Sequence, residues 1–175
     1  MRSIPVVVPG IMGSTLTSRS SAGEHPLWSD DFRTNYTTLV KSSGSLSWTG
    51  NRAFAKLLNK VTFSAPILPF PLVKFELWTR TLDWIAANPQ FDRALLVEYP
   101  YDWRAPLEET AAEMAKELAQ MVGSTVSLPR PRDQADFVFL MHSMGGLVTQ
   151  LAIGGWDAAS HVDWCARLYR HTPQG

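Results

Sequence analysis

Short apolar segments alternate along the chain with longer segments in which apolar residues recur every three or four positions. The short segments have the length and composition of buried strands, and they occur at about residues 4–8, 94–99, 136–141 and 166–170. The longer segments have the periodicity of amphipathic helices, and they cover about residues 73–87 and 107–122. Strands that alternate with helices indicate a mainly parallel sheet with helical crossovers. The pattern therefore predicts an α/β fold, with residues 1–175 belonging to a single domain.

The two predicted helices differ in the clarity of their signals. The clearer one has Pro106 suited to its first turn and Gly123 at its end. Its apolar positions are Leu107, Ala111, Met114, Ala115, Leu118 and Val122. The other helix is expected to stop near Asn88. Its predicted buried positions are Phe75, Trp78, Leu82 and Ile85.

Periodicity is weak between Thr15 and Leu72. Residues 18–23 and 42–45 are rich in serine and are expected to form loops. Residues 65–71 contain three prolines, which exclude a regular helix or a central strand. The region is therefore predicted to be an excursion from the sheet.

A predicted strand is followed directly by a serine and then by a predicted helix. The apolar run 137–141 stops at His142, Ser143 comes next, and residues 147–153 can continue as a helix. This order is typical of the nucleophile elbow, G-x-S-x-G, which holds a serine on a strained turn with its hydroxyl exposed. Here Gly145 supplies the second glycine and Met141 replaces the first. The alternative is a serine that only caps a helix, but the strand before it and the helix after it favour the nucleophile.

A glycine-rich turn, Pro9 to Ser14, follows the first predicted strand. Acyl transfer through a serine needs backbone N–H groups that point at the oxyanion of the tetrahedral intermediate. In proteins with a nucleophile elbow, one donor is the residue after the serine, here Met144, and the other lies in a loop after an early strand. Gly10 and Gly13 would let this loop turn tightly and present the N–H of Ile11 or Met12.

Five motifs in one order resemble the lecithin:cholesterol acyltransferase family of α/β-hydrolases. They are P-V-V-V-P-G-I-M-G-S-T-L from Pro5, L-W-S-D-D from Leu27, F-E-L-W from Phe75, Y-P-Y-D-W-R from Tyr99 and H-S-M-G-G from His142. Among them Y-D-W-R is the most specific, and the resemblance covers the chain from Ile4 to about Gly175. The family includes phospholipid:diacylglycerol acyltransferases, phospholipases and bacterial lipases.

The resemblance implies a doubly wound, mainly parallel sheet and serine-dependent chemistry on the acyl esters of phospholipids or acylglycerols. Ser143 is the implied nucleophile, and the N–H groups of Met12 and Met144 are the implied oxyanion donors. In this family the region at about residues 15–72 carries a mobile lid. A surface excursion with no gating role is the alternative.

Further residues receive roles from the same resemblance. Gly10, Ile11 and Trp103 are the implied substrate contacts, although Trp103 could equally pack on the core. Asp102 and Arg104 are expected to form a structural ion pair near the site and not to take part in catalysis.

The acid and the histidine of a catalytic triad are not assigned. In this fold they follow the serine along the chain, and the residues of these types after Ser143 are Asp157, His161, Asp163 and His171. All four come just beyond the predicted helix, whereas the family's acid and histidine follow later strands. His142 adjoins the serine and His25 lies in a polar segment, so neither is assigned. We therefore expect the triad acid and histidine to lie beyond Gly175. The chain would then be the N-terminal part of a larger enzyme, without its C-terminal strands and helices. We expect this part alone to be inactive.

Composition narrows the classes of partner. The net charge is zero, with 16 basic and 16 acidic residues and no block of one sign, which argues against nucleic-acid binding. No stretch reaches the roughly 20 apolar residues that span a membrane, and no signal peptide is recognised, so we expect a cytoplasmic or peripheral membrane protein. Cys165 is the only cysteine, which excludes an internal disulfide and a cysteine-based metal cluster. The expected partners are a lipid or acyl-ester substrate and a membrane surface, with no cofactor and no metal.

Two further functional hypotheses remain open. One is a non-catalytic relic of the fold, or a lipid-binding protein, that has lost the acid and the histidine. The other is a carboxylesterase in which water accepts the acyl group. The sequence decides neither between transferase and hydrolase nor the oligomeric state.

Overall fold

The computed structural model describes residues 3–64, 71–91, 95–123 and 137–154. Contacts between residues divide the chain into two compact units. The first unit comprises residues up to Val8, residues 89–99 and the residues from Pro106 onward. The second comprises residues 9–88 and 100–105.

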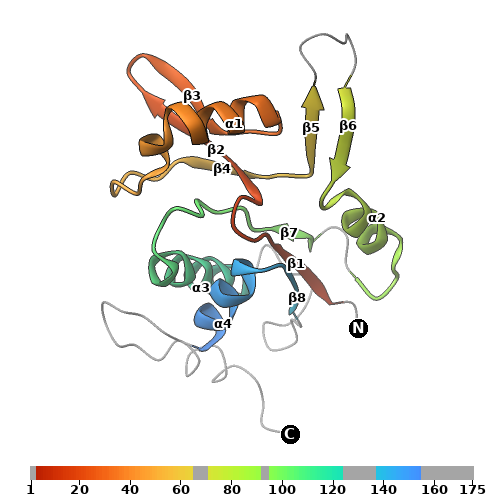
Figure 1. The fold of residues 1–175 in the computed structure, drawn as a ribbon. Coiled ribbons are helices and arrows are strands. Elements are labelled where there is room, and N and C mark those ends of the chain that lie inside the picture. Colours follow the sequence, from red (N-terminus) through yellow and green to blue (C-terminus); the bar gives the residue numbers. More distant parts are fainter. Residues whose placement is uncertain (1–2, 65–70, 92–94, 124–136, 155–175) are drawn as a thin grey trace, which may run out of the picture. The chain divides into compact units, whose positions relative to one another are not determined.

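The first unit contains a parallel sheet of three strands in the order β7-β1-β8 (Figure 1). The strands are β1 (Ile4–Val8), β7 (Val97–Glu98) and β8 (Phe137–Met141). All of β1 is buried, as expected for a central parallel strand of valine and isoleucine. Its ladder with β8 runs from Ile4 opposite Phe137 to Val8 opposite Met141, so the carboxyl ends of these two strands lie side by side.

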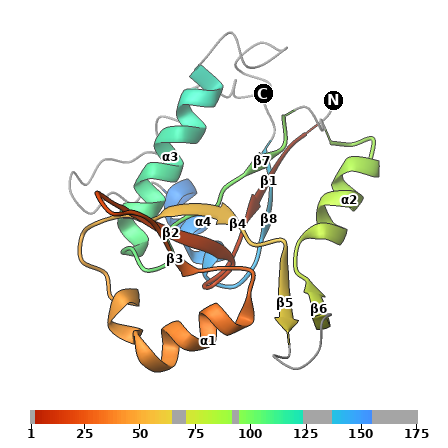
Figure 2. The same ribbon diagram turned by 90° about the horizontal axis from the view of Figure 1, so that it is seen from above.

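Two helices complete the described part of this unit, α3 (Leu107–Gly123) and α4 (Met144–Gly154). The helices lie side by side, and α4 packs against β1 and β8 (Figures 1 and 2). Buried residues of α3 include Ala111, Met114, Ala115 and Leu118, which belong to the predicted stripe. On α4 the buried Thr149 hydroxyl donates to the Gly145 carbonyl at 2.8 Å, so this polar group keeps a partner.

The second unit contains an antiparallel sheet of three strands in the order β3-β2-β4 and a separate pair, β5-β6. The strands are β2 (Ser14–Ser20), β3 (Gly23–Trp28), β4 (Phe54–Leu57), β5 (Lys60–Ser64) and β6 (Pro71–Glu76). The helices are α1 (Phe32–Lys41), the 3₁₀ helix η1 (Ser43–Leu46) and α2 (Thr79–Ala87). Leu16, Trp28 and Leu57 contribute to the core of this unit.

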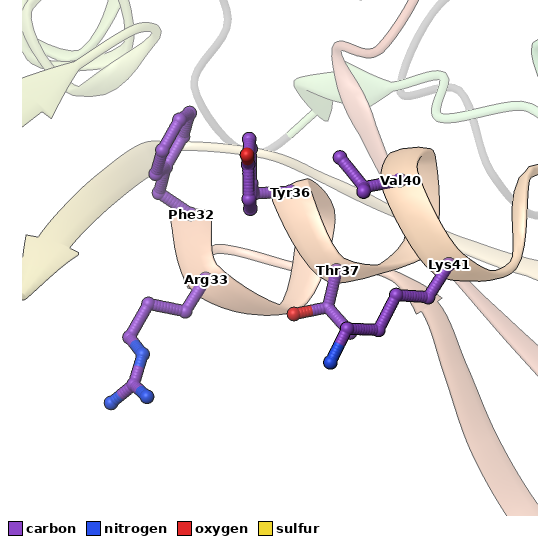
Figure 3. A pocket seen from close by; sticks show the side chains of 6 residues that line it. All are labelled: Phe32, Arg33, Tyr36, Thr37, Val40 and Lys41. Atoms are coloured by element: carbon purple, nitrogen blue, oxygen red, sulfur yellow. The ribbon is translucent and has the colours of Figure 1, made fainter.

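Helix α1 buries polar side chains and exposes apolar ones. Asn35 and Thr38 face inward, and the Asn35 amide exchanges two hydrogen bonds of 2.8 Å with the backbone of Ser29. The exposed large side chains are Phe32, Tyr36, Leu39 and Val40, each 41–62% exposed. Figure 3 shows that Phe32, Tyr36 and Val40 form one ridge, beside a second ridge of Arg33, Thr37 and Lys41. A shallow hollow is lined by the six side chains of the two ridges.

The helix predicted at residues 73–87 is wrong in its first part. Residues 71–76 form strand β6, and α2 begins only at Thr79. The sequence Leu72 to Phe75 favours a strand, and β6 gains a ladder in which Val73 lies opposite Phe63 and Phe75 opposite Val61. Among the described side chains predicted to be buried in this helix, only Ile85 is fully buried.

The weak periodicity between Thr15 and Leu72 also concealed regular structure. Residues 18–23, predicted as a loop, belong to the hairpin β2-β3, whose short turn ends at Gly23 with a φ of 123°. Residues 42–45, also predicted as a loop, lie largely in η1. Both strands of the hairpin are largely polar, so alternation of apolar residues could not reveal them.

The predicted parallel strands agree with the structure where it describes them. The strands predicted at residues 4–8 and 136–141 correspond to β1 and β8, and the helix predicted at 107–122 corresponds to α3. Of the strand predicted at 94–99, only residues 97–98 form β7, and residue 94 lies outside the described residues. The strand predicted at 166–170 lies outside them as well. No helix among the described residues has the length and apolar character needed to cross a membrane.

Candidate active site

Ser143 lies on a sharp turn between β8 and α4. The ladder with β1 continues one residue past β8, since the His142 N–H donates to the Val8 carbonyl at 3.1 Å. The chain then reverses within two residues, and α4 begins at Met144. The Ser143 side chain is exposed. The first unit therefore presents the serine hydroxyl at the carboxyl edge of its parallel sheet.

The backbone of Ser143 has a φ of 52°, in the left-handed region. The Gly145 N–H donates to the His142 carbonyl at 3.0 Å, which closes a four-residue turn with Ser143 in its second position. A positive φ at that position alone is the pattern of a type II′ turn, which normally has glycine there. A side chain in this conformation costs about 1–2 kcal/mol, and such strain is concentrated at functional sites.

Two neighbours of Ser143 bear on the elbow interpretation. Met141 occupies the position at which the usual motif has glycine. The residue is 47% exposed, so its side chain is not forced into the core. Met144 is the first residue of α4, and its N–H makes no hydrogen bond to the backbone of any described residue. Such an N–H at the positive end of a helix is suited to bind an anionic oxygen.

The turn that follows β1 belongs to the second unit and is also strained. Met12 has a φ of 61°, and Ser143 is the only other described residue with a side chain in this region. The Gly13 N–H donates to the Gly10 carbonyl at 3.0 Å, which closes a turn with Met12 in its third position. A Cβ atom on Gly13 would lie 2.8 Å from the Pro9 Cβ and 2.9 Å from the Gly10 carbonyl oxygen, so this position requires glycine. Gly10 and Gly13 thus close the turn through their backbone groups.

Aromatic side chains hold the carbonyl groups of this turn. The Tyr101 hydroxyl donates to the Pro9 carbonyl at 2.9 Å. The Trp28 indole donates to the Met12 carbonyl at 3.2 Å, and the Trp103 indole donates to the Ser14 carbonyl at 3.1 Å. The two indole rings pack edge to face with their centroids 5.6 Å apart. Of the two roles open for Trp103, the structure thus shows packing in the core of the second unit.

Asp102 and Arg104 form the ion pair that the sequence predicts. The contact is bidentate, with Arg104 Nη2 at 2.6 Å from Asp102 Oδ2 and Arg104 Nε at 2.8 Å from Oδ1. The side chains are 1% and 6% exposed, and the carboxylate also accepts from the Ala53 N–H at 2.8 Å. Burial by itself raises the pKa of Asp102, but the hydrogen bonds from Arg104 and Ala53 and the charge of Arg104 outweigh it, so the pKa is lowered. All these contacts lie within the second unit.

The structure brings the predicted residues together in two groups. Ser143 and Met144 share the elbow of the first unit, whereas Gly10, Ile11 and Met12 share the turn of the second. The described histidines are His142, which adjoins the serine, and His25 in β3. The acids and histidines from Asp157 to His171 lie outside the described residues.

Sequence analysis missed Trp28 as a support of the strained turn. Sixteen positions separate Trp28 from Met12, and the indole donates to a backbone carbonyl, which leaves no pattern in the sequence. Trp28 lies in the L-W-S-D-D motif, so its place in that motif was the only available signal.

Comparisons with known proteins do not identify the chain further. No family model matches it, and neither the curated proteins nor the solved structures gave a match. What the structure itself defines is an α/β protein with a parallel sheet and a strained serine turn between a strand and a helix.

Proposed function

We propose that the protein is a serine-dependent O-acyltransferase or lipase with an α/β-hydrolase fold, acting on the acyl esters of lipids. The observation that carries the proposal is the φ of 52° at Ser143 between β8 and α4. A serine that only caps a helix has an extended backbone and gains nothing from a strained one. The strain is understandable if the turn must expose the hydroxyl.

The chemistry follows from this arrangement. The Ser143 oxygen attacks the ester carbonyl and loses its proton to a general base, which we do not assign to a residue. The carbonyl oxygen becomes an oxyanion, for which the N–H groups of Met144 and Met12 are the proposed donors. Collapse of the intermediate releases the alcohol and leaves an acyl-serine. Water or a second alcohol then takes the acyl group, which makes the reaction a hydrolysis or a transfer.

Helix α1 supports a lipid surface as the partner. Its exposed ridge of Phe32, Tyr36 and Val40 is accompanied by Arg33 and Lys41, and the helix contains no acidic residue. Apolar side chains flanked by cations suit the interface of a membrane with anionic lipids, because the rings enter the boundary layer while the charges stay at the headgroups. We therefore propose that α1 docks on an anionic phospholipid surface.

Turnover by Ser143 variants tests the proposed function. The protein as its gene encodes it is incubated with p-nitrophenyl esters of increasing chain length and with phospholipid vesicles that contain a long-chain alcohol. We expect ester cleavage that Ser143→Ala abolishes and Ser47→Ala, a control at another exposed serine, leaves unchanged. Acyl-alcohol products would indicate transfer, and free fatty acid alone would indicate a lipase. Cleavage only of short, soluble esters would favour the carboxylesterase hypothesis.

Equal activity in wild type and Ser143→Ala would contradict the proposal. Vesicle binding without Ser143-dependent cleavage would support the alternative, a lipid-binding protein that retains the fold without the chemistry.

A further inference from the structure

The carbonyl groups of the turn after β1 are almost all bound by donors from the second unit. The aromatic donors Tyr101, Trp28 and Trp103 hold the carbonyls of Pro9, Met12 and Ser14. Backbone N–H groups hold two more, those of Gly10 and Gly13, the latter through Leu58 N–H at 3.0 Å. The turn therefore directs its negative dipole ends at its own unit.

The N–H groups of Ile11 and Met12, in the middle of the turn, can bind a ligand. Neither Ile11 nor Met12 donates its N–H to the backbone or side chain of a described residue. Residues Ile11 and Met12 are 52% and 38% exposed. Successive N–H groups in a turn that enters the left-handed region form a concavity that binds anions. Met12, with its φ of 61°, takes this turn into the left-handed region.

We propose that Trp28, Tyr101 and Trp103 are positioning residues, which hold the turn so that the N–H groups of Ile11 and Met12 bind an anionic oxygen. The inference rests on the proposed function, since the anionic oxygen that these N–H groups would bind is the oxyanion formed in acyl transfer. It gives a role to the Y-D-W-R motif: Tyr101 and Trp103 support the turn, and the Asp102–Arg104 ion pair fixes the segment that carries them.

Aromatic donors suit this role for physical reasons. A buried ring has few rotamers to lose, and each indole or phenol donates in a fixed direction. The edge-to-face contact of Trp28 with Trp103 couples two of the donors. Burial raises the pKa of Tyr101, so its hydroxyl keeps the proton that it donates throughout the neutral and mildly basic range.

Fixing the orientation of these N–H donors should lower the free energy of the transition state more than that of the substrate complex. A donor that is already oriented needs no reorganisation when charge develops on the carbonyl oxygen. Loss of the orientation should therefore lower kcat and leave KM nearly unchanged, because an interaction made only in the transition state is weakened.

The test uses Trp28→Phe, which keeps an aromatic ring opposite Trp103 and removes the indole donor. Tyr101→Phe is the second variant, because it removes only the hydroxyl that binds the Pro9 carbonyl. Trp48→Phe is the control, since it also exchanges a tryptophan for phenylalanine, at a ring whose centroid lies 5.9 Å from the Arg52 guanidinium carbon. Amide hydrogen exchange is measured at Gly13 and Leu58, whose N–H groups close and anchor the turn. Ester turnover is measured on the same proteins.

We expect exchange at Gly13 and Leu58 to accelerate about tenfold in Trp28→Phe and Tyr101→Phe, the effect of losing one hydrogen bond, and not in Trp48→Phe. We expect kcat to fall by about tenfold or more in the same two variants at constant KM. Unchanged exchange in both would overturn the claim that these donors hold the turn. Faster exchange with turnover equal to that of Trp48→Phe would overturn the positioning role.

Failure of the proposed function gives a different result. A wild-type protein without Ser143-dependent turnover would reject that function and the positioning role together. The exchange rates would still show whether the aromatic donors hold the turn.

Discussion

Ser143 and Met12 each have a side chain at a backbone conformation that favours glycine. Each follows a parallel strand of the first unit, Met12 after β1 and Ser143 after β8, and the last residues of those strands, Val8 and Met141, are paired. Both described non-glycine residues with a positive φ thus come shortly after paired strands of one sheet along the chain, which unrelated strain would not be expected to produce. The coincidence therefore supports a functional reason for both turns.

Glycine and alanine at position 143 separate backbone strain from chemistry. Both substitutions remove the hydroxyl, so both should abolish Ser143-dependent turnover. Because only glycine is free of strain at a φ of 52°, we expect Ser143→Gly to be more stable than Ser143→Ala by about 1–2 kcal/mol. Chemical denaturation of the two variants measures the difference. Equal stability, or a more stable alanine variant, would show that the turn is not strained in solution.

The buried Asp102–Arg104 pair predicts a loss of stability in acid. The pKa of Asp102 is lower in the folded protein than in the unfolded chain. Its contribution to stability is therefore complete above about pH 4 and is lost as the pH falls through the folded-state pKa. Asp102→Asn leaves Arg104 buried and uncompensated, so we expect a loss of about 3–5 kcal/mol at pH 7.

Thermal unfolding of wild type and Asp102→Asn between pH 7 and pH 2 checks this expectation. The difference in Tm should be constant from pH 7 to about pH 5 and should shrink below about pH 4. A difference that stays constant down to pH 2 would mean that Asp102 does not carry the acid dependence.

The helices and strands differ in whether the sequence pattern predicts them. Strands β1 and β8 and helix α3 were predicted because a continuous apolar run indicates a strand of a parallel sheet and one apolar stripe indicates a covering helix, although only β1 is fully buried among the described residues. The hairpin β2-β3 was missed because its residues are largely polar and exposed. Strand β6 was taken for helix because its apolar residues continue the spacing of α2, and only pairing with β5 shows the difference.

The candidate site was predictable to a similar extent. A serine between a strand and a helix is visible in sequence because a continuous apolar run precedes it and a largely apolar segment of helical length follows it. The strain at Met12 is not, because methionine is an unusual residue for a left-handed φ. The aromatic support of the turn is also invisible, since it joins residues up to 92 positions apart through backbone carbonyls.

Alanine substitution at two glycines is expected to change the stability of the protein in opposite directions. Gly146 lies within α4, and a Cβ there would meet nothing within 4 Å, so Gly146→Ala should stabilise the protein by about 0.5–1 kcal/mol. Gly13→Ala would force a Cβ against the backbone of Gly10 at 2.9 Å, so we expect a loss of about 1–3 kcal/mol. Urea denaturation measures both. Stabilisation by Gly13→Ala would contradict the close packing of the turn.

Helix α1, in the second unit, is predicted to dock on a lipid surface. Tyr36→Ser and Val40→Ser remove exposed apolar side chains, so stability should stay within about 0.5 kcal/mol of wild type. Each should weaken binding to vesicles with anionic lipid by about tenfold, the value of one apolar side chain that no longer enters the interface. Leu77→Ser, which changes an apolar residue outside α1 that is 48% exposed, is the control.

Vesicle sedimentation at low and high salt measures these affinities. Weaker binding at high salt in wild type would agree with a contribution from Arg33 and Lys41. Equal loss in Leu77→Ser would indicate that α1 is not the docking surface.

At the scale of the whole molecule, the proposed chemistry depends on one serine of the first unit, on two N–H groups of the second unit and on the order of the motifs. The sheet of the first unit presents Ser143, and the turn of the second unit presents the N–H groups of Ile11 and Met12. The α/β class is established by the parallel sheet and its helices. The α/β-hydrolase fold, lipid esters as substrates and acyl transfer are the proposals that follow from the serine turn, the motifs and α1.

The reaction of Ser143 with a fluorophosphonate probe tests the central claim most directly. The protein as its gene encodes it is treated with the probe, digested, and searched by mass spectrometry for the adduct. Assistance by a general base raises the rate of such a reaction by roughly 10²–10⁴-fold. We expect a single adduct, on Ser143, formed at least about 100-fold faster than any adduct on the exposed Ser47. Labelling of Ser143 no faster than that of Ser47 would contradict the central claim and would leave a strained turn without a nucleophile.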